Sequence, residues 1–191
     1  MPQYVHVFDM TDSNLGSDRR QRVRNSGKAN GITPVIIEMY GMSNGIAQMV
    51  SDIRQQVSSG QMRLLAIWGH GWSGGQLIAA GANAQEGVDE GSAMWSSNLE
   101  DYRPILQQLR PLFTSGGRVE LRGCQVASGV AGENFMIALA RILNKPVYAA
   151  TDIQGGLAGL KWDPDQLWNG PLVLANPDGS LACSLYTSLA D

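Results

Sequence analysis

The sequence carries little charge and no long apolar run. Asp, Glu, Lys and Arg make up 16% of its 191 residues, well below the roughly 25% of ordinary globular proteins. The formal net charge of -3 gives no general attraction to nucleic acid, so such binding would need a local basic patch. These values favour a compact, enzyme-like domain over a disordered or polyanion-binding one.

Membrane-spanning and secretory segments are also lacking. The longest apolar runs extend over only a few residues, whereas a transmembrane helix needs about 20. The start, Met1 to His6, has neither the basic nor the apolar region of a secretory signal. We therefore expect no membrane partner, and a protein that is cytoplasmic or is delivered from the cytoplasm without a signal peptide.

Cysteine and histidine are scarce. The chain holds two cysteines, Cys124 and Cys183, and two histidines, His6 and His70. Two cysteines cannot form a disulfide framework, although a single bridge between them stays open. We favour a reduced compartment with one functional thiol. Because these four residues lack the spacing of a structural zinc site, the sequence predicts neither a metal nor another cofactor.

Apolar strand patterns alternate with amphipathic helix patterns along the chain. The near-continuous apolar run Met62 to Trp68 is typical of a strand buried on both faces of a parallel sheet. The alternation predicts one α/β domain over residues 1–191, with a mostly parallel sheet and helices on both faces. The Pro-Asp-Gly turn after Asn176 predicts a C-terminal β-hairpin. Strands are expected at residues 4–9, 35–40, 62–68, within 76–80, 119–122 and 147–150, and helices within 18–30, 43–60, 99–113 and 131–143.

Two of the expected strands end at a glycine and then present a reactive side chain. The strand ending at Trp68 is followed by glycine and His70, and the strand ending at Arg122 by glycine and Cys124. Open α/β sheets bind ligands beyond the carboxyl ends of their strands, and an imidazole can activate a nearby thiol. We expect His70 and Cys124 to meet at this edge. The N–H groups of Gly71 and Cys124 would hold the oxyanion of a tetrahedral intermediate.

These motifs resemble those of the caspase-like cysteine peptidases (clan CD), which include separases, gingipains and metacaspases. His70-Gly71 precedes Gly123-Cys124 by roughly 50 residues, which is similar to the caspase spacing. The sequence is most similar to the caspase-like domain of large bacterial exoproteins, in the segments Leu121–Gly129, Ala131-Gly132 and Ala149–Asp152. The caspase-type Gln-Ala-Cys is absent. The resemblance implies a caspase-like three-layer sandwich, with Cys124 as nucleophile, His70 as general base and acid, and Gly71 as an oxyanion donor.

Two further residues bear on substrate specificity. Arg122 lies two residues before Cys124, and such residues of a strand share a face. Members of the resembled clan place a wall of the substrate pocket on that side. Arg122 would therefore favour an acidic substrate residue, whereas Asp152 would either pair with Arg122 or accept a basic one. We favour the acidic preference.

The glycine-rich loop after His70 matches two other motifs. Gly71 to Gly75 has the Gly-x-Ser-x-Gly pattern of serine hydrolases around Ser73, but that fold places its histidine after the serine, and both histidines here precede it. Gly69 to Gly74 has the dinucleotide-binding pattern, which should follow the first strand and open a helix. Here it follows the third strand and leads into too short a segment.

The leading hypothesis is a cysteine endopeptidase that cleaves protein or peptide substrates through a thioester at Cys124. The alternative is a catalytically inactive caspase-like module that binds a protein partner in the same cleft. A thiol hydrolase or acyl transferase acting on other substrates comes third. An arginine cluster within residues 19–24 is interpreted as a solvated helix face.

Overall fold

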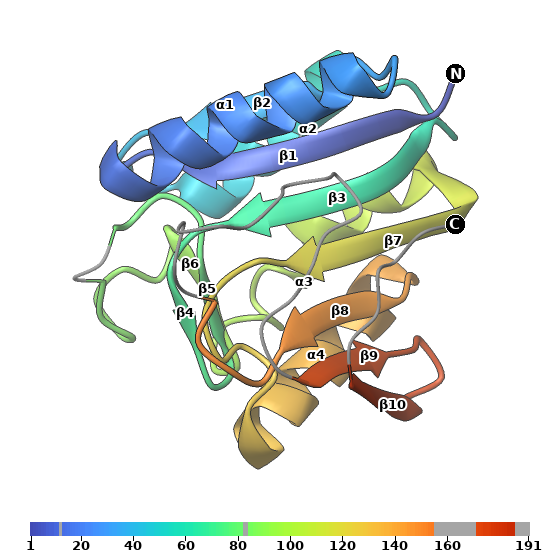
Figure 1. Cartoon of the computed structure of the whole chain (residues 1–191). Coiled ribbons are helices and arrows are strands. Elements are labelled where there is room, and N and C mark those ends of the chain that lie inside the picture. The colour runs from blue at the N-terminus through green and yellow to red at the C-terminus, as the bar shows by residue number, and fades with distance from the viewer. Residues whose placement is uncertain (12, 82–83, 155–170, 186–191) are drawn as a thin grey trace.

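A seven-stranded sheet runs through the molecule in the order β10-β9-β8-β7-β3-β1-β2 (Figure 1). This is a computed structural model that describes residues 1–11, 13–81, 84–154 and 171–185. Strands β2, β1, β3, β7 and β8 run parallel to one another, whereas β9 pairs antiparallel with both β8 and β10. The predicted mostly parallel sheet and C-terminal hairpin are confirmed. The strands span Gln3–Asp9 (β1), Val35–Met39 (β2), Met62–Trp68 (β3), Phe113–Leu121 (β7), Val147–Ala150 (β8), Pro171–Ala175 (β9) and Leu181–Leu185 (β10).

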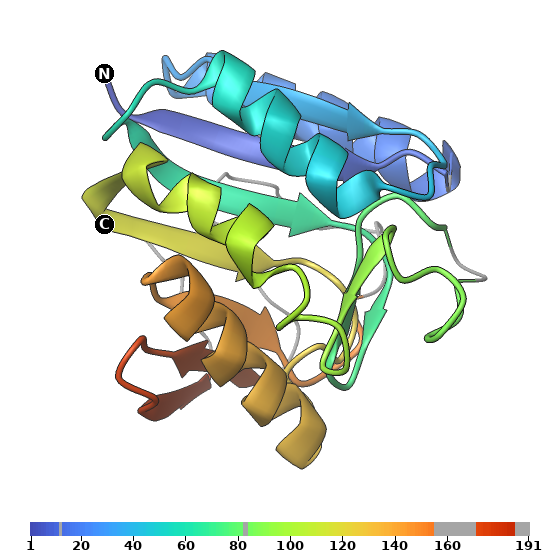
Figure 2. The same ribbon diagram turned by 180° about the vertical axis from the view of Figure 1, so that it is seen from behind.

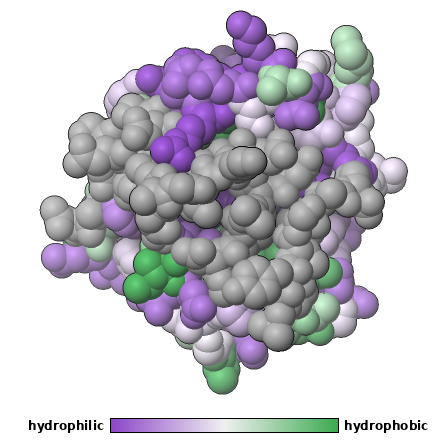
Figure 3. Space-filling view, in the orientation of Figure 1, coloured by the Kyte–Doolittle hydropathy of each residue, from purple (hydrophilic) through white to green (hydrophobic). Residues whose placement is uncertain are grey.

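Helices cover both faces of this sheet. Helix α1 (Ser13–Ala29) lies over the face seen in Figure 1, and its surface is rich in hydrophilic residues (Figure 3). Figure 2 shows α2 (Gly45–Gln56), α3 (Arg103–Leu106) and α4 (Gly129–Leu143) across the opposite face. Among the described ranges, no helix has the length and apolar character needed to cross a bilayer.

Strand β3 is buried on both faces, as its apolar run predicts. Leu65 and Ile67 belong to the larger core beneath α2 and α4. Leu64, Ala66 and Trp68 pack on the other side with Phe8 of β1 and Val23 of α1. The strand therefore links the two layers and lies next to β7 at the centre of the sheet.

The expected helix over residues 99–113 is wrong in extent. The structure has the short α3, a 3-10 helix at Gln107–Leu112, and β7 beginning at Phe113. Pro104 occupies the first turn of α3, and Pro111 lies inside the 3-10 helix. Proline lacks an N–H and disrupts the interior of an α-helix. The leucines of the expected stripe are nevertheless buried.

A second, three-stranded antiparallel sheet stands at the carboxyl edge of the main sheet (Figure 1). It consists of β4 (Gly71–Trp72), β5 (Gly75–Leu77) and β6 (Ala93–Trp95). The sequence predicts a strand or hairpin near β5 but not the third strand. Trp72 packs on buried Trp95 with ring centroids 4.7 Å apart. Since β4 begins directly after His70, this small sheet is part of the edge where the site is expected.

Candidate functional site

The ends of β3 and β7 leave the main sheet side by side. Ile67 pairs with Leu121 in the parallel ladder, and the N–H of Arg122 donates to the Ile67 carbonyl at 2.8 Å. Gly69 and then His70 follow β3, whereas Arg122, Gly123 and then Cys124 follow β7, and both His70 and Cys124 are half-buried. The two predicted residues thus leave the same edge from neighbouring strands.

Two glycines bring the segments that carry these residues into backbone contact. A Cβ atom added at Gly123 would lie 2.9 Å from the Cα of Gly71 and 3.0 Å from its N. Such distances are shorter than ordinary carbon contacts of about 3.5–4.0 Å, so neither glycine leaves room for a side chain between the segments. His70 directly precedes Gly71, and Cys124 directly follows Gly123. The two reactive residues therefore lie on touching stretches of backbone.

The N–H of Gly71 points away from the hairpin formed by β4 and β5. The His70 carbonyl accepts from the Leu77 N–H at 2.9 Å, which makes these two residues a hydrogen-bonded pair. Bonded and non-bonded pairs alternate in an antiparallel ladder. Gly71, which lies opposite Gln76, therefore forms a non-bonded pair, and its N–H is directed to the side opposite β5. This orientation suits the predicted oxyanion donor.

Main-chain hydrogen bonds fix the turn that contains Cys124 to the end of β8. The Gln125 N–H donates to the Asp152 carbonyl at 3.0 Å, and the Ala127 N–H donates to the Ala150 carbonyl at 3.1 Å. Gln125 has a φ of 56°, in the left-handed region that residues other than glycine seldom adopt. Across the described part of the chain, no group accepts the N–H of Cys124.

Gln76, on β5, connects the two segments and is not among the site residues that the sequence predicts. Its side-chain carbonyl accepts from the Gly123 N–H at 3.0 Å. Its amide nitrogen donates to the His70 carbonyl at 3.3 Å and to the Leu77 carbonyl at 2.9 Å. The side chain is fully buried, and burying an amide is costly unless it is hydrogen-bonded. No motif marks Gln76, and only its place in the expected strand at 76–80 pointed to this region.

The tip of the same hairpin is held to the turn after Cys124 by two further bonds. The Ser73 hydroxyl donates to the Ser128 carbonyl at 2.5 Å, and the Gly74 N–H donates to the Val126 carbonyl at 3.2 Å. The hydroxyl of the serine hydrolase motif is thus engaged in holding the hairpin in place.

Residues 26–166 match the family described as Domain of unknown function (DUF4347). The chain belongs to the DUF4347 family. Neither a comparison with curated proteins nor one with solved structures gives a match. The matched range includes His70, Cys124 and every contact given above between their segments. Since the family description assigns no activity, the function of this DUF4347 domain has to be argued from its own geometry.

A buried row of charges lies on the α1 side of β7 in this DUF4347 domain. Glu120 is fully buried and receives hydrogen bonds from Arg118 Nε and Arg122 Nε, each at 2.9 Å. Burial by itself raises the pKa of Glu120, but the neighbouring charges of Arg122 and Arg118 outweigh it and hold this pKa below its ordinary value. The row carries one negative and two positive charges.

The two predicted specificity residues of the DUF4347 domain differ in exposure. Arg122 is 5% exposed, is paired with Glu120, and stacks over Trp68 with its guanidinium carbon 5.2 Å from the ring centroid. Because β7 ends at Leu121, strand alternation does not place Arg122 on the side of Cys124. Asp152 is exposed. The roles of both in substrate binding stay predictions.

His6 lies in β1, on the sheet face that carries the charge row. It is 1% exposed, and its Nδ1 accepts from the indole N–H of Trp68 at 3.1 Å. Burial lowers the pKa of His6 from 6.5 to about 4, because a charged imidazolium is poorly solvated there. His6 is therefore neutral at physiological pH and takes part in packing.

The arginine cluster of α1 is largely engaged by other groups. Arg20 pairs with Glu38 of β2 at 2.6 Å, and Arg24 lies 3.7 Å from the same carboxylate. Arg19 is 8% exposed, and its guanidinium carbon lies 6.0 Å from the ring centroid of Trp68. These contacts tie α1 to the sheet and leave less basic surface than the sequence suggests.

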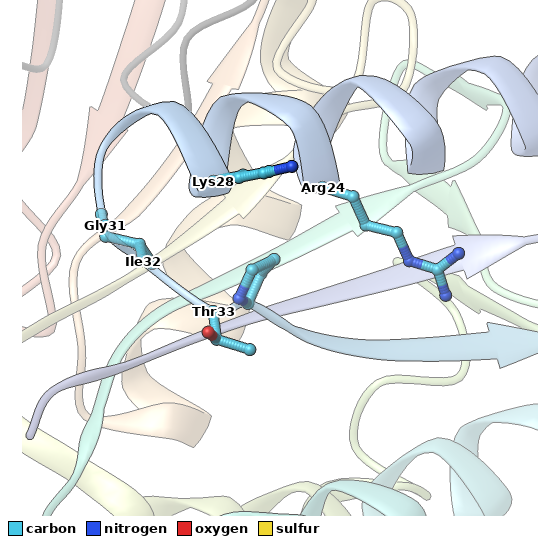
Figure 4. A pocket seen from close by; sticks show the side chains of 6 residues that line it. Arg24, Lys28, Gly31, Ile32 and Thr33 are labelled. Atoms are coloured by element: carbon cyan, nitrogen blue, oxygen red, sulfur yellow. The ribbon is translucent and has the colours of Figure 1, made fainter.

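Two cavities lie near the amino ends of the strands, at the end of the sheet opposite His70 and Cys124. One, of about 500 Å³, is lined by Arg24, Lys28 and residues 31–34 (Figure 4). The other, of about 680 Å³, is lined by residues 1–4, 31–33, Ser58 and Gln61. Neither contains a residue of the candidate site. Among the residues that the structure describes, no three His, Cys, Asp or Glu side chains gather to hold a metal ion.

Proposed function

We propose that this DUF4347 domain is a caspase-like cysteine endopeptidase that cleaves protein or peptide substrates with His70 and Cys124. The observation that carries the proposal is the backbone contact between Gly71 and Gly123. It joins the residue after His70 to the residue before Cys124. A nucleophile and its base must come within hydrogen-bond reach of one another, and adjacent backbone segments make that approach attainable.

The reaction divides into acylation and hydrolysis. The His70 imidazole takes the thiol proton of Cys124 while the sulfur forms a bond to the substrate carbonyl carbon. The N–H groups of Gly71 and Cys124 stabilise the resulting oxyanion. The imidazolium then protonates the leaving amine as the C–N bond breaks, which leaves a thioester. His70 next removes a proton from water, the hydroxyl attacks the thioester, and the Cys124 sulfur leaves as a thiol with the proton from His70.

Three features of the surroundings support this chemistry. The N–H of Gly71 is directed away from β5, and the N–H of Cys124 has no described acceptor. The left-handed backbone of Gln125 lies directly after the thiol, and strain of this kind clusters at functional sites. A mostly parallel sheet that ends in antiparallel strands also agrees with the fold that the sequence resemblance implies.

A preference for acidic substrate residues remains part of the proposal. Arg122 supplies the positive charge, but it already pairs with Glu120, so a substrate carboxylate would have to compete with that partner. Asp152 is exposed and accepts the Gln125 N–H through its main chain. Its carboxylate offers the opposite preference. The preferred substrate residue is therefore set by which side chain, Arg122 or Asp152, contacts the substrate.

Alkylation of Cys124 by iodoacetamide tests the proposal. Cys183 is the more exposed of the two cysteines, so every variant should carry Cys183→Ser to leave one reactive thiol. We expect His70→Ala to slow labelling of Cys124 at neutral pH roughly tenfold or more, because general-base assistance is commonly worth about 10²–10⁴-fold in rate. Cys124→Ala should abolish the hydrolysis of a mixed peptide library.

The same measurements can also contradict the peptidase proposal. Slow labelling of Cys124 that is equal with and without His70, together with no hydrolysis of the library, would contradict the peptidase. It would favour the catalytically inactive module that binds a protein partner. Circular dichroism of each variant serves as the control that the fold is retained.

A further inference from the structure

The Gln76 side chain makes hydrogen bonds to the two backbone segments that carry the proposed dyad. One end accepts from the N–H of Gly123, directly before Cys124, and the other donates to the carbonyl of His70. These two partners come from the ends of different strands, β3 and β7. Gln76 itself belongs to neither, because it stands on β5 of the small sheet. Its amide therefore acts as a bridge across the carboxyl edge.

The position of Gln76 in the hairpin explains why its side chain reaches both segments. It lies opposite Gly71 in a non-hydrogen-bonded pair, where the two Cα atoms approach to about 4.5 Å. Gly71 has no side chain to occupy the space, and Gly123 packs directly against Gly71. The Gln76 amide occupies the space between its own strand and the backbones of Gly71 and Gly123. Its oxygen accepts the N–H of Gly123 there.

Docking of the hairpin does not depend on Gln76 alone. The bonds of Ser73 to Ser128 and of Gly74 to Val126 hold its tip to the turn after Cys124. A change at position 76 should therefore leave the hairpin attached. What it removes is the link between the backbone of His70 and the residue before Cys124.

We propose that Gln76 is a positioning residue that sets the spacing and orientation of His70 relative to Cys124. This inference rests on the proposed peptidase. The bridge fixes the backbone on both sides of the site, so the imidazole is held where it can take the thiol proton. It also orients Gly71, whose N–H is one of the two proposed oxyanion donors. Without the bridge, the two segments keep their folds but lose their mutual alignment.

A double-mutant cycle on the alkylation rate tests the inference. In the Cys183→Ser background, the variants are Gln76→Met, His70→Ala and both together. Methionine has a similar length and flexibility but no hydrogen-bonding amide. We expect Gln76→Met to slow Cys124 labelling by about tenfold, the factor that corresponds to one buried hydrogen bond. The double variant should label at the rate of His70→Ala alone, and the pH profile of Gln76→Met should approach that of His70→Ala.

Asn98→Ala provides a matched structural control. Asn98 is also a buried amide, and it bonds to the Trp95 N–H and to the carbonyls of Glu90 and Ala93 at 2.9–3.0 Å. These partners belong to the small sheet and its loop, so the control loses comparable hydrogen bonds without touching the His70 or Cys124 segments. We expect Gln76→Met and Asn98→Ala each to lower the melting temperature. Asn98→Ala should label Cys124 at the rate of the unsubstituted protein.

Two results would overturn the inference, and they differ in what else they affect. If Gln76→Met labels at the unsubstituted rate, or slows labelling equally with and without His70, Gln76 has no positioning role and the peptidase proposal stands. If labelling of the unsubstituted protein does not depend on His70, the peptidase proposal and the role of Gln76 fall together.

Discussion

Acidification should destabilise this domain through His6. The imidazole is buried beside Trp68, and burial lowers its pKa from 6.5 to about 4. The negative charge of Glu120 raises the pKa of His6, whereas the positive charge of Arg122 lowers it further. Between these two pH values the unfolded chain binds a proton that the folded chain does not bind, so the free energy of unfolding falls as the pH falls.

The size of the effect follows from the two pKa values of His6. A difference of one pKa unit corresponds to about 1.4 kcal/mol. Relative to pH above 7, the loss of stability should reach about 2 kcal/mol at pH 5 and about 3 kcal/mol at pH 4. The loss then levels off below pH 4, where both states are protonated at this residue. Such amounts are a large part of the 5–15 kcal/mol typical of whole domains.

Urea unfolding at a series of pH values measures this loss when the protein is compared with His6→Gln. Glutamine does not titrate, and its side-chain oxygen can still accept the N–H of Trp68. The difference in unfolding free energy between the two proteins cancels the contribution of carboxylates such as Glu120. Between pH 7.5 and pH 5, we expect the unfolding free energy of the protein with His6 to fall by about 2 kcal/mol relative to that of His6→Gln.

A difference that stays constant with pH would refute the reasoning. So would an NMR titration that gives the His6 ring a pKa near 6.5 in the folded protein. Either result would mean that the imidazole reaches solvent, or that a neighbouring group stabilises its charge.

Two further predictions concern the candidate site. Gly123→Ala should abolish His70-dependent labelling and cost about 1–3 kcal/mol of stability, because the new Cβ would lie 2.7 Å from Gln76 Oε1 and 2.9 Å from the Gly71 Cα. Gly41→Ala, whose Cβ meets nothing closer than 3.7 Å, is the control, and a silent Gly123→Ala would contradict the close contact. In a peptide panel varying the residue before the cleaved bond, the role proposed for Arg122 predicts faster cleavage after Asp or Glu, and faster cleavage after Lys or Arg would assign the pocket to Asp152.

The sequence predicted the main sheet well because its strands have strong local signals. The apolar run Met62–Trp68 has one interpretation in an alternating α/β chain, and the glycines after it and before Cys124 marked the strand ends. The helix expected over residues 99–113 was wrong because leucines spaced by three residues fit a 3-10 helix as well as an α-helix. Pro104 and Pro111 were the available signal that the α-helix could not continue.

The bridge at Gln76 could not be predicted, since its partner Gly123 lies 47 residues away and a lone glutamine in a short strand has no local pattern. The pairing of Arg122 with Glu120 is easier to predict from the sequence. Residues two apart on a strand share a face, so the expected strand at 119–122 already placed the two charges together. The same rule does not hold for Arg122 and Cys124, because the strand ends before either of them.

The attachment of the Cys124 turn to β8 has a consequence for synthesis. Gln125 and Ala127 bond to Asp152 and Ala150, so a growing chain that has reached only α4 contains both reactive residues but lacks the strand that shapes the turn. Contacts between segments distant in sequence also form late in folding, because the loop-closure entropy is lost before they stabilise the chain. The proposed active site would therefore be completed only after the polypeptide has emerged through residue 152, and nascent chains would be protected from their own nucleophile.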